Sequence, residues 1–189
     1  PLSEACIFTA HTADDRIENF YMRSIVGTGP GGFRSMLYRN GPVVRPLLDL
    51  TRDELRDYLS ARESAGETVV RDESGALWRE DATNAHTDRF RAYVRHKIVP
   101  VAKEWNSALP EVLTRSMNLI ADEDDMLQNM AEKLAEESAE WVAEDDTFGI
   151  DRSEGFRLLP AFGKAERPLQ RRAVLRLLEA MLGPDARVE

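Results

Sequence analysis

Residues 5–25 read ACIFTAHTADDRIENFYMRSI, and the fold prediction starts from this stretch. Its first six residues form a short apolar run rich in strand formers, which is typical of a buried parallel strand. Thr12 then stands where a helix N-cap belongs, Asp14 and Asp15 fall in the first turn, and apolar residues recur beyond them at helical spacing. The stretch therefore predicts a strand, a short turn and a helix.

A similar alternation follows. The glycine-rich residues 27–32 end the first helix, and residues 43–48 form a second short extended run. Thr51 and Glu54 have the spacing of a capping box, which opens a helix through about Arg62. Strands alternating with helices indicate an α/β domain built on a parallel sheet.

Residues 66–80 predict a small hairpin, because two apolar runs flank a polar turn. Beyond it the pattern becomes helical. Apolar residues step by three or four from Phe90 to Trp105, so we expect them to line one face of a helix, with a kink at Pro100.

The rest of the chain predicts helices only. Residues 113–141 carry apolar and small residues with a mean step of 3.5, and a last helix begins near Pro168 and stops at Gly183. We expect a boundary near residues 103–107. The expected domains are therefore residues 1–104, the α/β part with the hairpin insertion, and residues 105–189, an all-helical part.

Composition excludes several classes of protein. The 189 residues contain no apolar run of the length that a membrane span needs, and a single cysteine, Cys6, excludes an internal disulfide framework. No Cys/His cluster has zinc-site spacing, and a cytoplasmic location is expected. The net charge is −9, but eleven of the 34 acids lie between residues 121 and 146 with one base. Because the residues outside this stretch are close to neutral overall and contain basic clusters, the net charge does not exclude a nucleic-acid partner.

The densest ionisable group is His11 with Asp14, Asp15 and Glu18. On a strand-to-helix turn these side chains would face the carboxyl end of a parallel sheet, where ligands bind in open α/β folds. Carboxylates there suit Mg²⁺ bridging nucleotide phosphates, and a histidine suits donation to a developing charge. Acids in a first turn also serve as caps without further function, so the spacing leaves both interpretations open.

The glycine loop and two basic clusters are the other candidates for chemistry. The amides of residues 27–32 suit a phosphate, although the loop serves equally as a helix stop. The basic clusters suit nucleic-acid phosphates or a solvated face that pairs with the acidic helix. Their members are Arg89, Arg91, Arg95, His96 and Lys97 in the first, and Arg167, Arg171, Arg172 and Arg176 in the second.

Four motifs in this order resemble one family, the tRNA(Ile)-lysidine synthetases, which are PP-loop enzymes of bacteria. Residues 9–18, TAHTADDRIE, look like the family's Thr-Ala-His-x-x-Asp-Asp-Gln-x-Glu segment, and residues 20–36 look like the helix and Arg-Gly-x-Gly loop after it. Residues 45–55 are similar to the next motif, Arg-Pro-Leu-Leu with Thr-Arg-x-Glu-Leu. The order closes with Glu-Asp-x-Thr-Asn from residue 80, Arg91-x-x-x-Arg95 and Val99-Pro100. The resemblance covers residues 9–101, and the helical remainder is similar more loosely.

The resemblance implies a ligase that uses ATP and Mg²⁺ to adenylate the wobble cytidine of tRNA(Ile), after which free lysine displaces AMP and forms lysidine. It implies catalytic roles for His11, Asp14 and Asp15, with Asp15 also a metal ligand, and approach of Gly27 and Gly29 to nucleotide phosphate. The residues that it implies for substrate or tRNA are Arg45, Asn84, Arg91, Arg95, Arg171 and Arg172.

The chain departs from the family pattern at Arg16, Val26 and Ala92, which stand where the family has glutamine, arginine and asparagine. The family's PP-loop is expected before Pro1, so the chain is expected to be a piece of a longer protein and inactive alone. Rival interpretations are another PP-loop tRNA-modifying enzyme and a non-catalytic helical nucleic-acid-binding module. A homodimer is also among the expectations, because the sequence does not say what covers the sheet edge.

Overall fold

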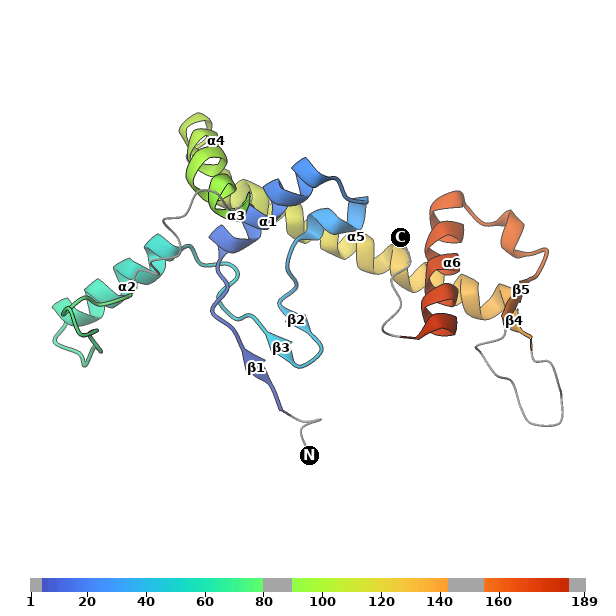
Figure 1. The fold of residues 1–189 in the computed structure, drawn as a ribbon, viewed down its shortest axis with the longest axis horizontal. Helices are drawn as coiled ribbons and strands as arrows, with labels where there is room; N and C mark the ends of the chain where they lie inside the picture. The colour runs from blue at the N-terminus through green and yellow to red at the C-terminus, as the bar shows by residue number, and fades with distance from the viewer. Residues whose placement is uncertain (1–4, 80–89, 143–154, 184–189) are drawn as a thin grey trace. The chain divides into compact units, whose positions relative to one another are not determined.

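The computed structural model describes residues 5–79, 90–142 and 155–183, and the structural statements below concern those residues (Figure 1). The chain is mostly helical with two small sheets. It divides into two compact units, Pro1–Ala121 and Asp122–Glu189, which are described separately. The boundary expected near residues 103–107 coincides with a helix end inside the first unit and stays a prediction. No described helix has a stretch long and apolar enough to cross a bilayer.

The sheet of the first unit has three strands of two residues in the order β1 (Ile7–Phe8), β3 (Val43–Val44) and β2 (Arg39–Asn40). Strand β1 runs parallel to β3, with Ile7 opposite Val43, and β2 pairs antiparallel with β3 (Figure 1). The sequence predicted that the first strand is buried. This prediction is wrong, because Ile7 and Phe8 of β1 are 54% and 70% exposed. Two-residue strands expose both faces unless a second layer covers them.

Helix α1 (Ala13–Val26) begins where the sequence predicts. The Thr12 amide and hydroxyl both donate to Asp15 Oδ2, at 2.9 and 3.0 Å, so that Asp15 caps the helix. The helix ends at Gly27, whose φ of 94° lies in the region that favours glycine. A short 3₁₀ helix, η2 (Pro30–Arg34), follows it.

Helix α2 (Arg52–Ser64) carries the predicted capping box. The expected hairpin after it is wrong, because residues 66–79 contain a turn but no strand. The Asp72 carboxylate accepts bonds from the Ser74 and Ala76 amides, at 2.9 Å each, which closes the turn locally. The indole of Trp78 packs under the Arg56 guanidinium of α2, 5.3 Å from charge to ring centre, so the loop packs on a helix instead of forming a ladder.

The next helical segment contains α3 (Phe90–Tyr93), a π-helical turn, η4 (Val94–Ile98), and α4 (Val99–Trp105). The kink predicted at Pro100 corresponds to this π turn, in which the Val99 amide donates to the Val94 carbonyl oxygen, five residues back. A π turn adds one residue and rotates the following face by about 100°. The expectation of one continuous apolar face is therefore wrong, and Trp105 is 90% exposed.

Helix α5 (Leu109–Ser138) continues past the division at residue 121. In the first unit, Met117 is fully buried, and Leu113 packs with the core of Ile17, Val94 and Val99. This core fastens α1 to the helices that carry the basic residues.

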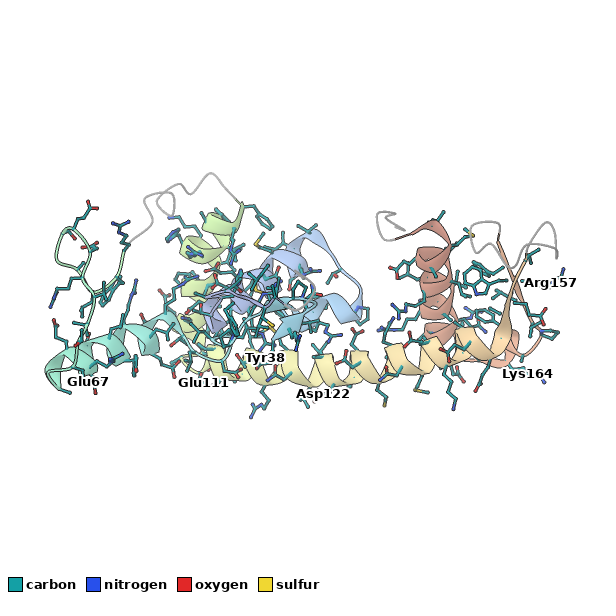
Figure 2. All side chains as sticks on the ribbon, turned by 90° about the horizontal axis from the view of Figure 1, so that it is seen from below. Tyr38, Glu67, Glu111, Asp122, Arg157 and Lys164 are labelled. Carbon is teal, nitrogen blue, oxygen red and sulfur yellow. The ribbon has the colours of Figure 1, made fainter. Side chains whose placement is uncertain are left out.

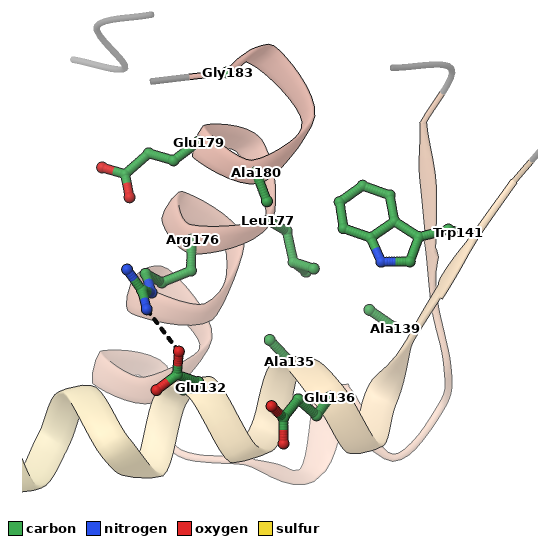
Figure 3. A pocket seen from close by; sticks show the side chains of 10 residues that line it. All are labelled: Glu132, Ala135, Glu136, Ala139, Trp141, Arg176, Leu177, Glu179, Ala180 and Gly183. Atoms are coloured by element: carbon green, nitrogen blue, oxygen red, sulfur yellow. Dashed lines mark hydrogen bonds and ion pairs between the residues drawn. The ribbon is translucent and has the colours of Figure 1, made fainter. Parts of the chain in front are cut away.

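The second unit contains the rest of α5, β4 (Ala139–Trp141), β5 (Phe156–Leu158), the 3₁₀ helix η5 (Phe162–Lys164) and α6 (Arg167–Leu182). The expectation of an all-helical part is wrong, because β4 and β5 pair antiparallel and α5 ends at Ser138. Trp141 meets Phe156 edge to face across the pair, 5.8 Å between ring centres. Figure 3 shows Trp141 facing Leu177 of α6, whose predicted end at Gly183 is confirmed.

Candidate functional site

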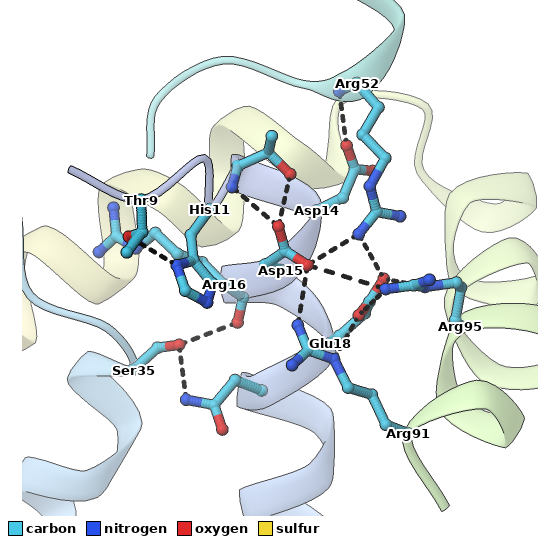
Figure 4. A network of polar contacts seen from close by, with 12 residues as sticks. Thr9, His11, Asp14, Asp15, Arg16, Glu18, Ser35, Arg52, Arg91 and Arg95 are labelled. Carbon is cyan, nitrogen blue, oxygen red and sulfur yellow. Dashed lines mark hydrogen bonds and ion pairs between the residues drawn. The ribbon is translucent and has the colours of Figure 1, made fainter. Parts of the chain in front are cut away.

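The carboxylate of Glu18 lies at the centre of a polar network between α1, α2 and the π turn (Figure 4). Glu18 is 1% exposed and accepts bonds from Arg95 Nε at 2.7 Å and Arg91 Nε at 2.9 Å. Arg95 Nη2, at 3.0 Å, and Arg52 Nη2, at 3.2 Å, complete the set. Three guanidinium groups thus compensate one buried carboxylate, which holds three segments of the chain together.

Asp15 joins the same network with its second oxygen. Its Oδ1 lies 2.8 Å from Nη2 of both Arg52 and Arg91, while Oδ2 is used by Thr12. Burial by itself raises the pKa of Asp15, but the Thr12 amide and the charges of Arg52 and Arg91 outweigh it, and the pKa lies below its ordinary value. Asp15 is therefore ionised at neutral pH and already accepts four hydrogen bonds.

Asp14 fastens the start of α2. Its Oδ2 accepts the Arg52 amide at 2.8 Å, and Oδ1 lies 3.2 Å from Lys103 Nζ. A first-turn acid of one helix thus satisfies an unpaired amide at the start of another. Asp14 also binds a cation from α4, so both of its oxygens have donors.

A cavity of about 350 Å³ opens beside this network. Its basic walls exceed its acidic ones, since four lysine or arginine side chains and a histidine face three carboxylates. The charged and ionisable residues that line it are Asp14, Glu18, Asp53, Arg52, Arg56, Arg95, His96 and Lys103. Arginines held in place by buried carboxylates favour an anion such as phosphate, because little side-chain entropy is lost on binding.

The structure places His11 apart from the acids with which the sequence grouped it. Its Nδ1 lies 2.9 Å from the Thr9 hydroxyl, and Figure 4 shows this contact away from Arg52, Arg91 and Arg95. In the described part of the chain, no group of three or more histidine, cysteine or acidic side chains is arranged to hold a metal ion. The Asp15 carboxylate, whose lone pairs already accept four donors, does not fit Mg²⁺ as a direct ligand in this arrangement.

The remaining predicted residues lie elsewhere. Gly27 ends α1 and Gly29 precedes η2, while Arg45 donates from Nη1 to Leu37 O at 3.0 Å. Asn84 lies outside the described residues. In the second unit, Arg172 Nη2 lies 2.6 Å from Asp124 Oδ1 on α5, whereas Arg171 is exposed. The two interpretations of the basic cluster on α6 therefore apply to different residues. Arg172 pairs with the acidic helix α5, whereas Arg171 is exposed to solvent.

Sequence reasoning missed Arg52, Arg56 and Lys103. Arg52 follows the cap of α2, a position that predicts an exposed first-turn residue. Its side chain reaches back to α1 across a gap of more than thirty residues in the chain, and no local spacing encodes that contact. The one indication in the sequence was that acidic residues outnumber basic residues at the start of α1, so that distant basic residues were needed as partners.

The buried Arg16 joins α1 to α5. It is 1% exposed, donates from Nη2 to Asn118 Oδ1 at 2.9 Å and lies 5.5 Å from the Tyr38 ring centre. Figure 2 shows side chains crowded around Tyr38, whose hydroxyl donates to Asp49 at 2.5 Å. Burial and the Asp49 carboxylate raise the pKa of Tyr38. The departure from the family pattern at residue 16 therefore has a structural role.

The fold and site define a mixed helix-and-sheet domain with an arginine-lined cavity at the first turn of α1. The PP-loop domain family matches residues 2–102, more than half of the chain, and the chain belongs to that family. It is similar to a tRNA(Ile)-lysidine synthase of Thermus thermophilus, 35% identical over 184 residues, which cover 96% of this chain and 31% of the relative.

Two further relatives carry the same name. The protein of Porphyromonas gingivalis is 39% identical over 58% of this chain and 22% of its own length. That of Dehalococcoides mccartyi is 29% identical over 95% of this chain and 36% of its own length. The chain thus spans about a third or less of the relatives that it matches.

Replacing Glu18 by glutamine tests the central carboxylate. We expect Glu18→Gln to lower the free energy of unfolding by about 3–5 kcal/mol, because three guanidinium groups lose their buried counter-charge. Asp53→Asn is the matched control: this exposed acid also pairs with an arginine, and its loss should cost less than about 1 kcal/mol. Urea unfolding followed by circular dichroism measures both, and equal effects would contradict the central role of Glu18.

The lowered pKa of Asp15 predicts a specific acid sensitivity. A carboxyl with a lowered folded-state pKa stabilises the fold above its unfolded pKa, about 3.9, and that contribution disappears as the pH falls through the folded value. We therefore expect Asp15→Asn to be less stable than the parent chain at pH 7 and this difference to shrink below about pH 4. Urea titrations between pH 7 and pH 3 measure the difference, and a pH-independent one would contradict the assignment.

Proposed function

We propose that the chain is part of an ATP-dependent enzyme that modifies tRNA by joining lysine to the wobble cytidine of tRNA(Ile). The observation that carries the proposal is the clamp of Arg52, Arg91 and Arg95 by Asp15 and Glu18, beside a cationic cavity within the matched family domain. The names of the relatives supply the substrate. The proposal covers the whole protein, of which this chain supplies part of the site.

The proposed chemistry has two steps. The cytidine C2 oxygen bonds to the α-phosphorus of ATP and pyrophosphate leaves; the lysine ε-amino nitrogen then bonds to C2, loses a proton and displaces AMP, which carries that oxygen away. Both steps place negative charge on phosphate groups. Fixed guanidinium groups stabilise such charge with little reorganisation, which is the role proposed for Arg91 and Arg95.

The acids have supporting roles in this proposal. Asp14 and Asp15 position Arg52, and Asp15 with Glu18 positions Arg91, so that the arginines meet the substrate in one geometry. His11 is proposed to assist adenylation, and Gly27 and Gly29 to approach nucleotide phosphate. Mg²⁺ is proposed to enter with ATP on its phosphates; its coordination by Asp15 would require Arg52 or Arg91 to move away.

The proposed architecture extends that of the described chain. Strands β1 and β3 would belong to a Rossmann-like parallel sheet, with residues 1–104 in the ligase domain and residues 105–189 forming a tRNA-binding domain. A homodimer and a cytoplasmic location remain predictions. Thiolation by a related PP-loop enzyme is the rival proposal, and Cys6 is the single cysteine of these 189 residues.

The decisive assay uses the full-length parent protein with ATP, Mg²⁺, radiolabelled lysine and a tRNA(Ile) transcript. We expect label in the precipitated RNA, and we expect it to disappear when the wobble cytidine is replaced. The 189-residue chain alone is expected to incorporate none, since the family's ATP-binding PP-loop, which has the pattern Ser-Gly-Gly-x-Asp-Ser, is not within it. ATP consumption with another tRNA and no label in tRNA(Ile) would instead favour a different PP-loop modification.

Two neighbouring arginines of α6 provide a test of tRNA binding. Both Arg171→Ala and Arg172→Ala should weaken binding to all tRNAs, but through different causes. Arg171 is exposed, so its loss should leave stability unchanged and reduce the slope of log affinity against log salt by about 0.7–0.9. Arg172 pairs with Asp124, so its loss should also lower the unfolding temperature.

Filter binding across salt concentrations and thermal unfolding measure the two effects. Lys133→Ala on α5 is the control, because this lysine is exposed and pairs only with its helix neighbour Glu137 among the ion pairs of the described residues. An unchanged affinity in both arginine variants would remove α6 from the proposed tRNA surface.

A further inference from the structure

The second unit contains a cavity of about 680 Å³, which is lined by the last two turns of α5 and of α6 (Figure 3). Part of its wall is apolar: Ala135 and Leu177 are buried, and the indole of Trp141 faces Leu177 there. Phe156 holds Trp141 in place by an edge-to-face contact. A cavity of this size with an aromatic wall suits a small organic molecule.

The charged residues of this cavity are predominantly acidic. Arg176 is the one base among its described lining residues, and its Nη2 already lies 2.6 Å from Glu132 Oε1. Glu136 and Glu179 also line the cavity, and the carboxylate of neither has a hydrogen bond or an ion pair with the described residues. Two negative charges therefore remain without a counter-charge, and they attract a cation.

The helix ends add to this negative potential independently of the side chains. The C-terminus of a helix carries about half a negative charge, which lysine or arginine in the last turn commonly offsets. Neither α5 nor α6 has a basic residue in its last turn. Instead, Glu136 lies in the last turn of α5, and Glu179 lies in that of α6. Both helix ends at this cavity thus lack the usual cation.

The apolar wall favours an organic cation over a metal ion. Hard metal ions need several oxygen ligands grouped around one point, and no such group of three or more side chains occurs in the part of the chain that the structure describes. An aliphatic stem, in contrast, gains free energy by packing against Trp141 and Leu177. An ammonium group beside an indole is also attracted by the negative face of the ring.

We propose that this cavity binds an alkylammonium ion, a small molecule whose aliphatic stem packs against Trp141 and whose ammonium groups pair with Glu136 and Glu179. A diamine or polyamine and free lysine share this chemistry. The polyamine is the expected ligand, because the free carboxylates repel the carboxylate of lysine. All lining residues of the cavity belong to the second unit, so the inference does not rest on the proposed function.

Nuclear magnetic resonance of the 189-residue chain tests the location of binding. The chain has three tryptophans, and Trp141→Phe assigns the indole N–H signal of Trp141. We expect titration with cadaverine or spermidine to shift this signal to saturation. The signals of Trp78 and Trp105 should stay nearly constant, because these residues do not line the cavity. Cadaverine is lysine without its carboxylate, so titration with lysine compares the two sources, and pentanediol is the uncharged control of the same length.

Glutamine substitutions test the two carboxylates. Glu136→Gln and Glu179→Gln keep the side-chain shape at exposed positions, and thermal unfolding verifies that both variants fold. Loss of one such carboxylate predicts about threefold to tenfold weaker binding of cadaverine. Glu137→Gln is the matched control, since this exposed glutamate lies in the same helical turn as Glu136 but does not line the cavity. It should bind cadaverine as the parent chain does.

A saturable shift of the Trp141 signal that weakens in both cavity variants, but not in Glu137→Gln, supports the proposal. The proposal is overturned if neither amine shifts the signal, if the folded cavity variants bind as the parent does, or if pentanediol binds as tightly as cadaverine. Equal weakening in Glu137→Gln also overturns it, because this result indicates diffuse attraction of amines to an acidic chain. Lysine that binds as tightly as cadaverine assigns an amino acid as the ligand, whereas binding of the amines alone assigns a polyamine.

Discussion

The buried carboxylate of Glu18 is the constraint on which the first unit depends. A charge that is removed from water costs several kcal/mol unless counter-charges and hydrogen bonds replace its hydration. Arg52, Arg91 and Arg95 supply them from α2, α3 and the π turn. Because α2 and the continuous helical segment of α3 and the π turn are distant from α1 in the chain, compensation of one carboxylate fixes both of them against α1, and the arginines acquire a single orientation as a consequence.

Helix α1 makes polar contacts with several other segments of the first unit. Its first turn holds the acids that organise the arginine network, while Arg16 joins it to α5 through Asn118 and Asn19 joins it to the loop after η2 through Ser35. The helix thus contributes to two cavities of different charge balance. Acids line one of them and fix its arginines, whereas arginines without an aspartate or glutamate are among the described residues that line the other, which lies between α1 and η2.

Local patterns predicted the helix starts with one-residue accuracy where capping chemistry was present. Thr12 and Thr51 start helices at the expected residues, because their hydrogen bonds lie within four residues of the chain. Predictions failed where longer contacts competed: the loop at residues 66–79 packs Trp78 on Arg56 instead of pairing with itself, and Trp141 leaves the helical seam for a strand opposite Phe156. The exposed Trp105 follows from the extra residue of the π turn, which periodicity alone does not reveal.

The sequence alone was sufficient for the family resemblance, the helix starts and the grouping of acids at the first turn of α1, since each depends on neighbouring residues. It did not reveal that Arg52 reaches Asp15, that His11 contacts Thr9 instead of the acids, or that Arg23, Arg34 and Arg45 share a cavity. Those facts depend on which side chains meet after the chain has folded. Burial makes such meetings decisive, because an ionised group in the interior is stable only beside its partner.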